Sequence, residues 1–254
     1  MPTLAVASLI RNEINHWLPS VLNAWTSFAD TVIILDDNSN DGTYEYLQKQ
    51  PKVQLFQRED KTPMWGQEVI ARQELWRLAV QSKADWIMIA DGDMVPACDP
   101  SILFTGVEPD AVAFLLYDLW SINPYRFRYD GFWQAHNAFR IWAVRNPGPG
   151  FEDAWPARGI HCGHFPHNLP VNRALYAPPE YGLLHLAYSD EESRQRKLEQ
   201  YMSKAGQLSR QEYEHAASIT EHPMLADFSY PVQWRLERAC VYKEPDSEAA
   251  SMEG

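Results

Sequence analysis

Over roughly the first hundred residues, short apolar runs alternate with longer stretches in which apolar and polar positions are mixed. The runs at 4–10, 32–35 and 86–90 have the length of strands and almost no polar residues, which is typical of strands buried on both faces. Between them, apolar residues recur at helical spacing in 17–25 and 69–79. This alternation predicts an α/β fold in which helices connect the strands of a mostly parallel sheet.

The remaining segments are less regular. A short helix is expected from about Thr43 and a strand at 53–56, with further strands at 111–120 and 140–144. Prolines and glycines between 146 and 179 favour a long ordered loop over regular structure.

Two serine–glutamate pairs indicate where late helices begin. Ser189 with Glu192, and Ser209 with Glu212, have the spacing of capping boxes. The segment 243–254 carries little apolar material, so we expect a disordered acidic tail there.

Composition narrows the class of partner. The chain of 254 residues is 45% hydrophobic, enough for a substantial core, and its formal net charge is −12. An acidic chain without a basic run is a poor partner for duplex nucleic acid. No stretch reaches the roughly 20 apolar residues of a transmembrane segment. The three cysteines are far apart, which argues against a disulfide framework. We therefore expect a cytoplasmic protein, with peripheral membrane association left open.

Candidate chemistry lies where two apolar runs end in acid. One run leads to Asp37 and another to Asp91-Gly92-Asp93. Because ligands of open α/β sheets bind beyond the carboxyl ends of the strands, we expect these acids to line one crevice. Carboxylate oxygens suit Mg²⁺ or Mn²⁺, which complete their shells with water and substrate phosphates. The pattern therefore predicts a site for a cation that bridges two phosphates.

Simpler interpretations exist for these segments. Asp-Gly-Asp also occurs as an ordinary turn, and residues 37–42 fit the first half of a calcium-binding loop. The twelfth position of that loop is Gln48, which cannot supply the bidentate carboxylate. Histidines and a cysteine at 161–167 suggest zinc only weakly, because no second ligand pair accompanies them. The preceding buried strand favours a metal site at Asp91 and Asp93.

Four segments occur together in the order and spacing of family 2 glycosyltransferases, which this chain resembles, its bacterial and phage members in particular. The segments are 9–13, 34–43, 71–72 and 90–93. The resemblance implies a GT-A fold, which is a Rossmann-like nucleotide-binding mixed sheet flanked by helices, with an irregular C-terminal acceptor region. It implies one domain with a nucleotide-sugar-binding half at 1–110 and an acceptor and catalytic half at 111–242.

The resemblance assigns the donor nucleotide to four residues of the first half. Asp37 would accept a hydrogen bond from the base, and Glu13 would contact the nucleoside. Arg11 and Arg72 would face the nucleotide. These roles agree with the chemistry, because a carboxylate accepts from an imide N–H and a guanidinium group can bind two phosphate oxygens at once.

The resemblance also implies a metal centre. Asp93 would bind the metal directly, Asp91 would contact the ribose or a metal-bound water, and His185 would complete the metal shell. His185 stands in an apolar segment, where a lone histidine is also common as a hydrogen-bonded core residue. The implied cofactors are Mn²⁺ or Mg²⁺ and a nucleotide-diphosphate sugar. A UDP-sugar is the first expectation, with GDP- and dTDP-sugars as the alternatives.

Inverting transfer needs a carboxylate that takes the proton of the acceptor hydroxyl. In bacterial members of the family, an arginine-containing strand leads to a His-Glu pair, and here Cys162 stands at the position of that glutamate. A Glu-Asp pair after a Gly-Pro-Gly segment resembles the pair that supplies the base in many members. The candidates are Asp153, then Glu152, with Asp130 and His161 as alternatives.

The expected reaction is metal-dependent, inverting transfer of a sugar from a nucleotide-sugar to a hydroxyl of a saccharide, a lipid-linked saccharide or another acceptor. A sugar-phosphate nucleotidyltransferase is the alternative enzyme, but its usual glycine-rich loop is missing from residues 8–15. A non-catalytic nucleotide- or carbohydrate-binding protein is the third possibility, which Cys162 keeps open. The pattern leaves the oligomeric state undecided.

Overall fold

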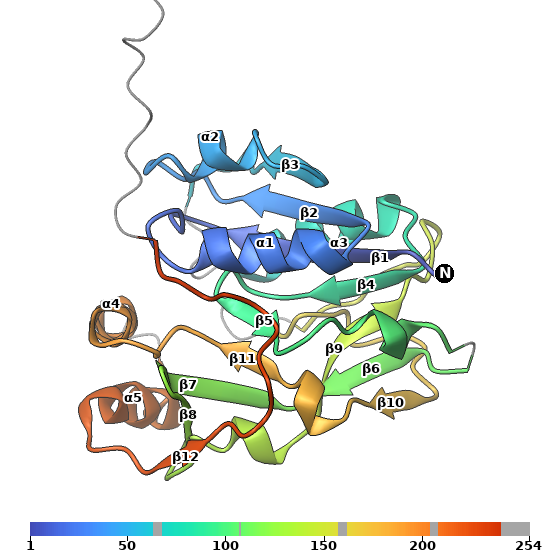
Figure 1. The fold of residues 1–254 in the computed structure, drawn as a ribbon. Helices are drawn as coiled ribbons and strands as arrows, with labels where there is room; N and C mark the ends of the chain where they lie inside the picture. The colour runs from blue at the N-terminus through green and yellow to red at the C-terminus, as the bar shows by residue number, and fades with distance from the viewer. Residues whose placement is uncertain (63–67, 107, 157–161, 204–207, 240–254) are drawn as a thin grey trace, which may run out of the picture.

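The computed structural model describes residues 1–62, 68–106, 108–156, 162–203 and 208–239. In this part of the chain, seven strands form one sheet. They are β1 (Leu4–Ile10), β2 (Thr31–Asp36), β3 (Val53–Gln57), β4 (Trp86–Ile89), β6 (Ala111–Phe114), β9 (Arg140–Arg145) and β10 (Ala174–Tyr176). Their order is β10-β6-β9-β4-β1-β2-β3, and Figure 1 shows this sheet running from the top of the molecule to the lower right.

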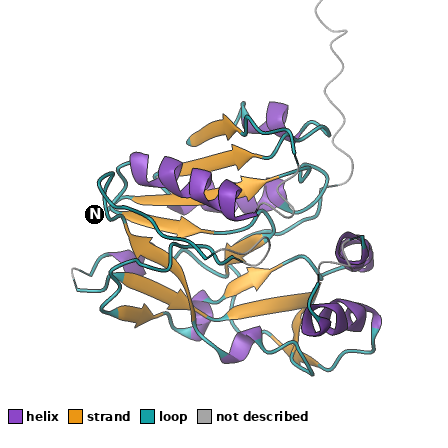
Figure 2. Ribbon diagram, turned by 180° about the vertical axis from the view of Figure 1, so that it is seen from behind, coloured by secondary structure: helices purple, strands orange, loops and turns teal. Residues whose placement is uncertain are grey.

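Helices cover both faces of this sheet. Helix α1 (Leu18–Phe28) lies on the face toward the viewer in Figure 1, and α3 (Glu68–Gln81) lies on the opposite face, seen in Figure 2. Side chains alternate along β1, so that Val6 packs in the core beneath α1 and Ala7 packs in the core beneath α3. Burial on both faces explains why the strand sequences are apolar without alternation. The short helix α2 (Thr43–Leu47) follows β2.

Five further strands of the described chain form a second sheet at the lower left of Figure 1. They are β5 (Met94–Pro96), β7 (Leu116–Ile122), β8 (Tyr125–Arg128), β11 (Leu183–His185) and β12 (Leu225–Asp227), in the order β12-β8-β7-β11-β5. Helices α4 (Glu191–Met202) and α5 (Arg210–Ala217) lie beside this sheet (Figure 1).

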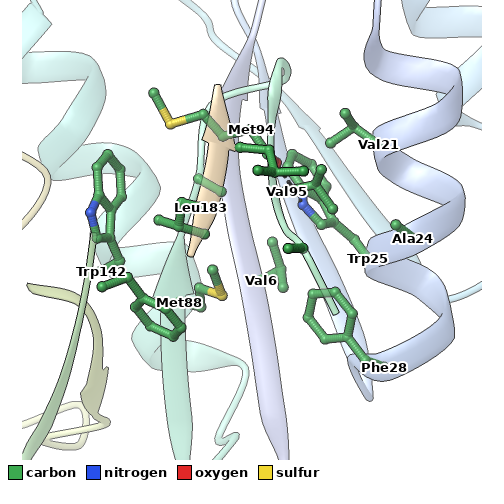
Figure 3. Packing of buried hydrophobic residues seen from close by; sticks show 14 of the residues in the cluster. Val6, Val21, Ala24, Trp25, Phe28, Met88, Met94, Val95, Trp142 and Leu183 are labelled. Carbon is green, nitrogen blue, oxygen red and sulfur yellow. Dashed lines mark hydrogen bonds between the residues drawn. The ribbon is translucent and has the colours of Figure 1, made fainter. Parts of the chain in front are cut away.

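The two sheets share one hydrophobic core. Figure 3 shows Trp25 of α1, Met88 of β4, Val95 of β5 and Leu183 of β11 in the same cluster. The indole Nε1 of Trp25 donates a hydrogen bond to the carbonyl oxygen of Met94 at 3.1 Å, which ties α1 to β5. This shared core holds the second sheet against the carboxyl edge of the first, where the acidic segments lie.

The predicted α/β class, with a mixed sheet flanked by helices, is confirmed. Strand β1 runs parallel to β2 and β4, whereas β9 runs antiparallel to β4 and β6. Within the described ranges, no helix is both long and apolar enough to cross a bilayer.

Two expectations for the second half were wrong. The single strand expected at 111–120 is two strands, since β6 pairs with β9 in the first sheet while β7 pairs with β11 in the second. Both segments are apolar, so the sequence pattern does not show that the chain passes from the first sheet to the second between them. The expected loop at 146–179 contains β10, which pairs with β6 in parallel.

The late helices agree with the prediction, with one change of cap. Helix α5 begins with the predicted capping box at Ser209. Helix α4 is capped by Asp190, whose side chain accepts a hydrogen bond from Ser193 N at 2.8 Å, while Ser189 Oγ donates to Leu186 O. The tail expected to be disordered, 243–254, lies outside the described residues.

Candidate active site

The carboxyl ends of β1, β2 and β4 lie side by side, because β1 pairs in parallel with both of its neighbours. Arg11 follows β1 directly, Asp37 follows β2, and Asp91 comes two residues after the end of β4. The fold therefore places these predicted residues along one edge of the sheet, as expected for an open α/β fold.

The carboxylate of Asp37 is fully buried and is engaged at both oxygens. Arg58 Nη1 donates to Oδ1, and Arg11 Nη1 lies 3.3 Å from Oδ2. Arg58 is itself buried, while Arg11 is partly exposed. In this structure Asp37 orients two guanidinium groups, and its contact with a nucleotide base stays a prediction.

Asp91 lies between two cationic or potentially cationic side chains. Arg72 Nη2 donates to its Oδ1 at 3.1 Å, and His164 Nε2 lies 3.7 Å from its Oδ2. Burial alone would raise the pKa of Asp91, but Arg72 and His164 outweigh burial and hold this pKa well below its ordinary value. Asp91 is therefore a carboxylate at neutral pH. Arg72 Nη1 is buried and has no hydrogen-bond partner among the described residues.

Strand pairing in the second sheet brings together Asp93, Asp118 and His185. Strand β11 lies between β5 and β7, and its register sets His185 opposite Asp118 and opposite Met94, the residue after Asp93. His185 Nδ1 lies 2.7 Å from Asp118 Oδ1, and His185 Nε2 lies 3.7 Å from Asp93 Oδ1. Burial would lower the pKa of His185, but the two carboxylates outweigh it and raise this pKa.

Helix α4 adds two consecutive cations. Arg196 Nη1 donates to Glu13 Oε1 at 3.1 Å, and Lys197 Nζ lies 3.6 Å from Asp93 Oδ2. Burial raises the pKa of Glu13 even against the opposing effect of Arg196, and Glu13 Oε2 has no partner among the described residues. Burial would lower the pKa of Lys197, but Asp93 outweighs it, so the ammonium group stays charged.

These residues fit a divalent cation at Asp93 and His185. A carboxylate accepts hydrogen bonds only, so Asp118 holds the Nδ1–H form of His185 and leaves Nε2 facing Asp93 as a donor atom for a metal. A carboxylate oxygen beside an imidazole nitrogen is a donor set that Mn²⁺ accepts. Across the described ranges, no group of three or more His, Cys, Asp or Glu side chains is arranged around a single metal position.

Gly92 keeps the acidic turn close to the loop after β1. A Cβ at this position would lie 2.7 Å from Ile10 Cδ1 and 3.7 Å from Glu13 Cγ. In the structure, the space beside Gly92 is occupied by the protein's own side chains.

The predicted catalytic bases, Asp153 and Glu152, have contacts of their own in the structure. Asp153 Oδ2 accepts a hydrogen bond from Trp155 Nε1 at 2.6 Å, and Arg77 of α3 lies 4.0 Å from its Oδ1. Glu152 accepts from Asn168 through its backbone oxygen. Among the contacts of the described residues, none joins either acid to the Asp93–His185 pair.

The alternatives for the base were Asp130 and His161, and Cys162 stands at the position of the expected glutamate. Asp130 is held by Arg128 and by the backbone N–H of Met224. Burial raises the pKa of the Cys162 thiol to about 11, so this side chain is neutral at physiological pH. His161 lies outside the described residues.

Three residues of the site were missed at the sequence level. Asp118 has a local signal, because it is a single carboxylate inside an apolar run that forms β7. A buried charge of this kind requires a partner. Arg58 and Arg196 have no such signal, since their partners lie far away along the chain.

A cavity of about 780 Å³ lies near the Glu13–Arg196 pair, although neither residue lines it. It is near this pair because His16 N bonds to Glu13 O, and because Glu192 precedes Arg196 by one helical turn. Its lining consists of Asn15, His16, Trp17, Ile122, Ser189, Asp190, Glu191, Glu192, Leu236, Glu237, Arg238 and Ala239.

No protein-family model matches the chain. Uncharacterized proteins of Mycobacterium bovis (strain ATCC BAA-935 / AF2122/97) and Mycobacterium tuberculosis (strain ATCC 25618 / H37Rv) are each 25% identical to it over 195 residues. The match covers 73% of this chain and 46% of either relative. The chain thus spans about half the length of the curated relatives it matches.

Solved structures show distant similarity. One is mannosyl-3-phosphoglycerate synthase from Rubrobacter xylanophilus, with a TM-score of 0.32 and 14% identity over 45% of this chain and 41% of that chain. Another is 4-diphosphocytidyl-2C-methyl-D-erythritol synthase, with a TM-score of 0.33 and 11% identity. The match covers 57% of this chain and 74% of that chain. A third is HddC from Yersinia pseudotuberculosis, with a TM-score of 0.37 and 10% identity. The match covers 79% of this chain and 100% of that chain. Similarity at this level assigns neither a fold family nor a reaction.

Proposed function

We propose that the chain transfers a sugar from a nucleotide-diphosphate sugar to a hydroxyl group of an acceptor, with Mg²⁺ or Mn²⁺ as cofactor. The observation that carries this proposal is the pairing of Asp93 with His185 at the carboxyl edge of the first sheet. Asp118 orients the imidazole of His185 so that Nε2 faces Asp93. A donor set of this kind, at the position where α/β sheets bind ligands, suits a cation that holds a diphosphate.

Cationic side chains around this pair support a diphosphate as the ligand. Arg72 is buried and keeps one nitrogen without a partner among the described residues, and a guanidinium group binds phosphate oxygens well. Arg11, held by Asp37, stands at the same edge. Mg²⁺ or Mn²⁺, when bound, would offset the negative charge that develops on the departing diphosphate.

Glu13 suits a contact with the nucleoside. One of its carboxylate oxygens is bound by Arg196, and the other is buried without a partner among the described residues. Such an oxygen would accept a hydrogen bond from a ribose hydroxyl, which would remove the cost of leaving it unpaired.

The cavity beside the Glu13–Arg196 pair offers room for an acceptor next to the donor. Its volume of about 780 Å³ lies in the range of small-molecule sites, and its lining mixes apolar side chains with carboxylates. Asp153 as the catalytic base stays a prediction. In the free chain its carboxylate is held by Trp155, so it would have to exchange that contact for the acceptor hydroxyl.

The proposal is tested with a panel of nucleoside diphosphates. Unfolding temperatures are measured with UDP, GDP, ADP, dTDP and CDP, each with and without Mn²⁺, and we expect one base to stabilise the protein in a metal-dependent way. Hydrolysis of the matching sugar donor is then compared between Asp93→Ala and the control Asp227→Ala, whose carboxylate is exposed. Asp93→Ala should lose turnover while it keeps its fold. Metal-dependent hydrolysis retained in Asp93→Ala would refute the assignment.

The alternative reaction has its own signature. A sugar-phosphate nucleotidyltransferase would release pyrophosphate from a nucleoside triphosphate in the presence of a sugar phosphate. We expect no such release, because the loop from Arg11 to Trp17 contains no glycine to wrap the triphosphate.

A further inference from the structure

Lys197 has a position that the proposed metal site alone does not explain. Its ammonium nitrogen lies 3.6 Å from Asp93 Oδ2, and the other oxygen of the same carboxylate faces His185 Nε2 at 3.7 Å. The side chain of Asp93 is only 6% exposed, and that of Lys197 is 22% exposed. In the free chain the negative charge of Asp93 is therefore balanced by a lysine.

A lysine in this place competes with a divalent cation. Both are attracted to Asp93, and they repel each other at the short distances that one carboxylate allows. Two neighbouring acids already have an arginine partner, because Arg72 binds Asp91 and Arg196 binds one oxygen of Glu13. Lysine carries its charge on a flexible four-carbon chain, so the ammonium group can move to another anion nearby.

We propose that Lys197 is a diphosphate-binding residue that neutralises Asp93 in the free protein and moves to the donor phosphates when a divalent cation binds Asp93. This inference rests on the proposed function. It has a specific consequence for binding. The cation displaces Lys197 from Asp93, and the diphosphate gives the displaced ammonium group a partner, so each ligand favours the binding of the other.

The test uses the full chain with Lys197→Met, which keeps most of the side-chain length and removes the charge. Lys49→Met is the matched control, since Lys49 is an exposed lysine just after α2. Two affinities are measured separately. Paramagnetic resonance of free Mn²⁺ gives the affinity for metal without nucleotide. Calorimetry at saturating Mn²⁺ gives the affinity for UDP, or for the nucleoside diphosphate that the panel selects.

The two affinities should change in opposite directions. Without Lys197, we expect Mn²⁺ to bind about threefold or more tightly, because a competing cation is gone. The nucleoside diphosphate should bind about tenfold more weakly, because a charge-assisted contact is lost. Lys197→Arg should keep both affinities near the wild-type values. A purely structural role for Lys197 would weaken both ligands together or neither.

The outcomes separate this inference from the proposed function. If wild type shows no metal-coupled binding of any nucleoside diphosphate, the proposed function fails and this inference fails with it. If wild type binds but Lys197→Met matches Lys49→Met in both affinities, or loses affinity for Mn²⁺, only the inference is overturned. Thermal unfolding of Lys197→Met checks its fold. Should that variant fail to fold, Lys197→Gln is measured by the same two assays against the same criteria.

Discussion

Replacing Arg58 by methionine should destabilise the protein strongly. Arg58 and Asp37 form an ion pair in which the side chains are 1% and 0% exposed, so the change leaves a carboxylate buried without its main partner. Removing one member of a buried pair costs about 3–5 kcal/mol. Arg11 remains 3.3 Å from the second oxygen of Asp37 and is 27% exposed, so it compensates in part. We therefore expect a loss of about 2–4 kcal/mol in the free energy of unfolding.

Urea denaturation, followed by fluorescence and circular dichroism, measures this loss, and coincident transitions check that unfolding is two-state. Asp37→Asn and the double variant complete a thermodynamic cycle. The double variant should be more stable than the sum of the two single losses predicts, because it leaves no buried charge unpaired. Arg210→Met is the control, since Arg210 belongs to an exposed ion pair on α5, and it should leave stability unchanged.

Two results would refute this reasoning. One is an Arg58→Met variant that unfolds at the wild-type urea concentration, which would mean that water or Arg11 fully replaces the lost partner. The other is strict additivity of the two single changes, which would mean that the two side chains do not interact energetically in the folded protein.

Three further predictions follow from individual contacts. Gly182→Ala should lower the free energy of unfolding by about 1–3 kcal/mol, because a Cβ there would collide with the ring of Tyr117. The control Gly150→Ala, with no atom within 4 Å of its Cβ, should leave stability unchanged when both variants are compared by chemical denaturation. Asp118→Asn should weaken Mn²⁺ binding about 10- to 100-fold in a paramagnetic resonance titration, because His185 loses the carboxylate that orients it, and an unchanged affinity would contradict this. Burial and two nearby arginines lower the pKa of His16 to about 4. Since the unfolded chain binds that proton first, stability should fall on the order of 1–2 kcal/mol from about pH 6.5 to pH 4, and His16→Gln should remove this part of the slope in denaturation measured against pH.

The part of the fold that could be predicted is the part whose strands are buried on both faces. In β1, β2 and β4, continuous apolar runs end in polar turns, and the helices between them show helical spacing. The same pattern placed Arg11 and the acids after β2 and β4 at one edge, since parallel strands end on the same side. These features depend on residues that are close together in the chain.

Most of the second sheet could not be predicted from the pattern. Strands β5, β11 and β12 have three residues each, which is too short for any periodicity to appear. Their places come from pairing with distant strands, and this pairing brings Asp118 and His185 together across 67 positions of sequence. His185, one of the two candidate metal ligands, therefore lies on a strand that leaves almost no signal in the sequence.

By itself, the sequence determined the α/β class, the succession of the main strands and helices, and the acids that follow β2 and β4 at one edge of the sheet. Only the tertiary structure decided which charges meet there: Asp37 is enclosed by arginines, Asp93 faces His185 and Lys197, and Glu13 is bound by a residue 183 positions away. The physical reason is that burial of a strand or helix imposes a hydrophobic pattern on residues that are neighbours in the chain. An ion pair requires only that two side chains meet in space, at any separation in the sequence.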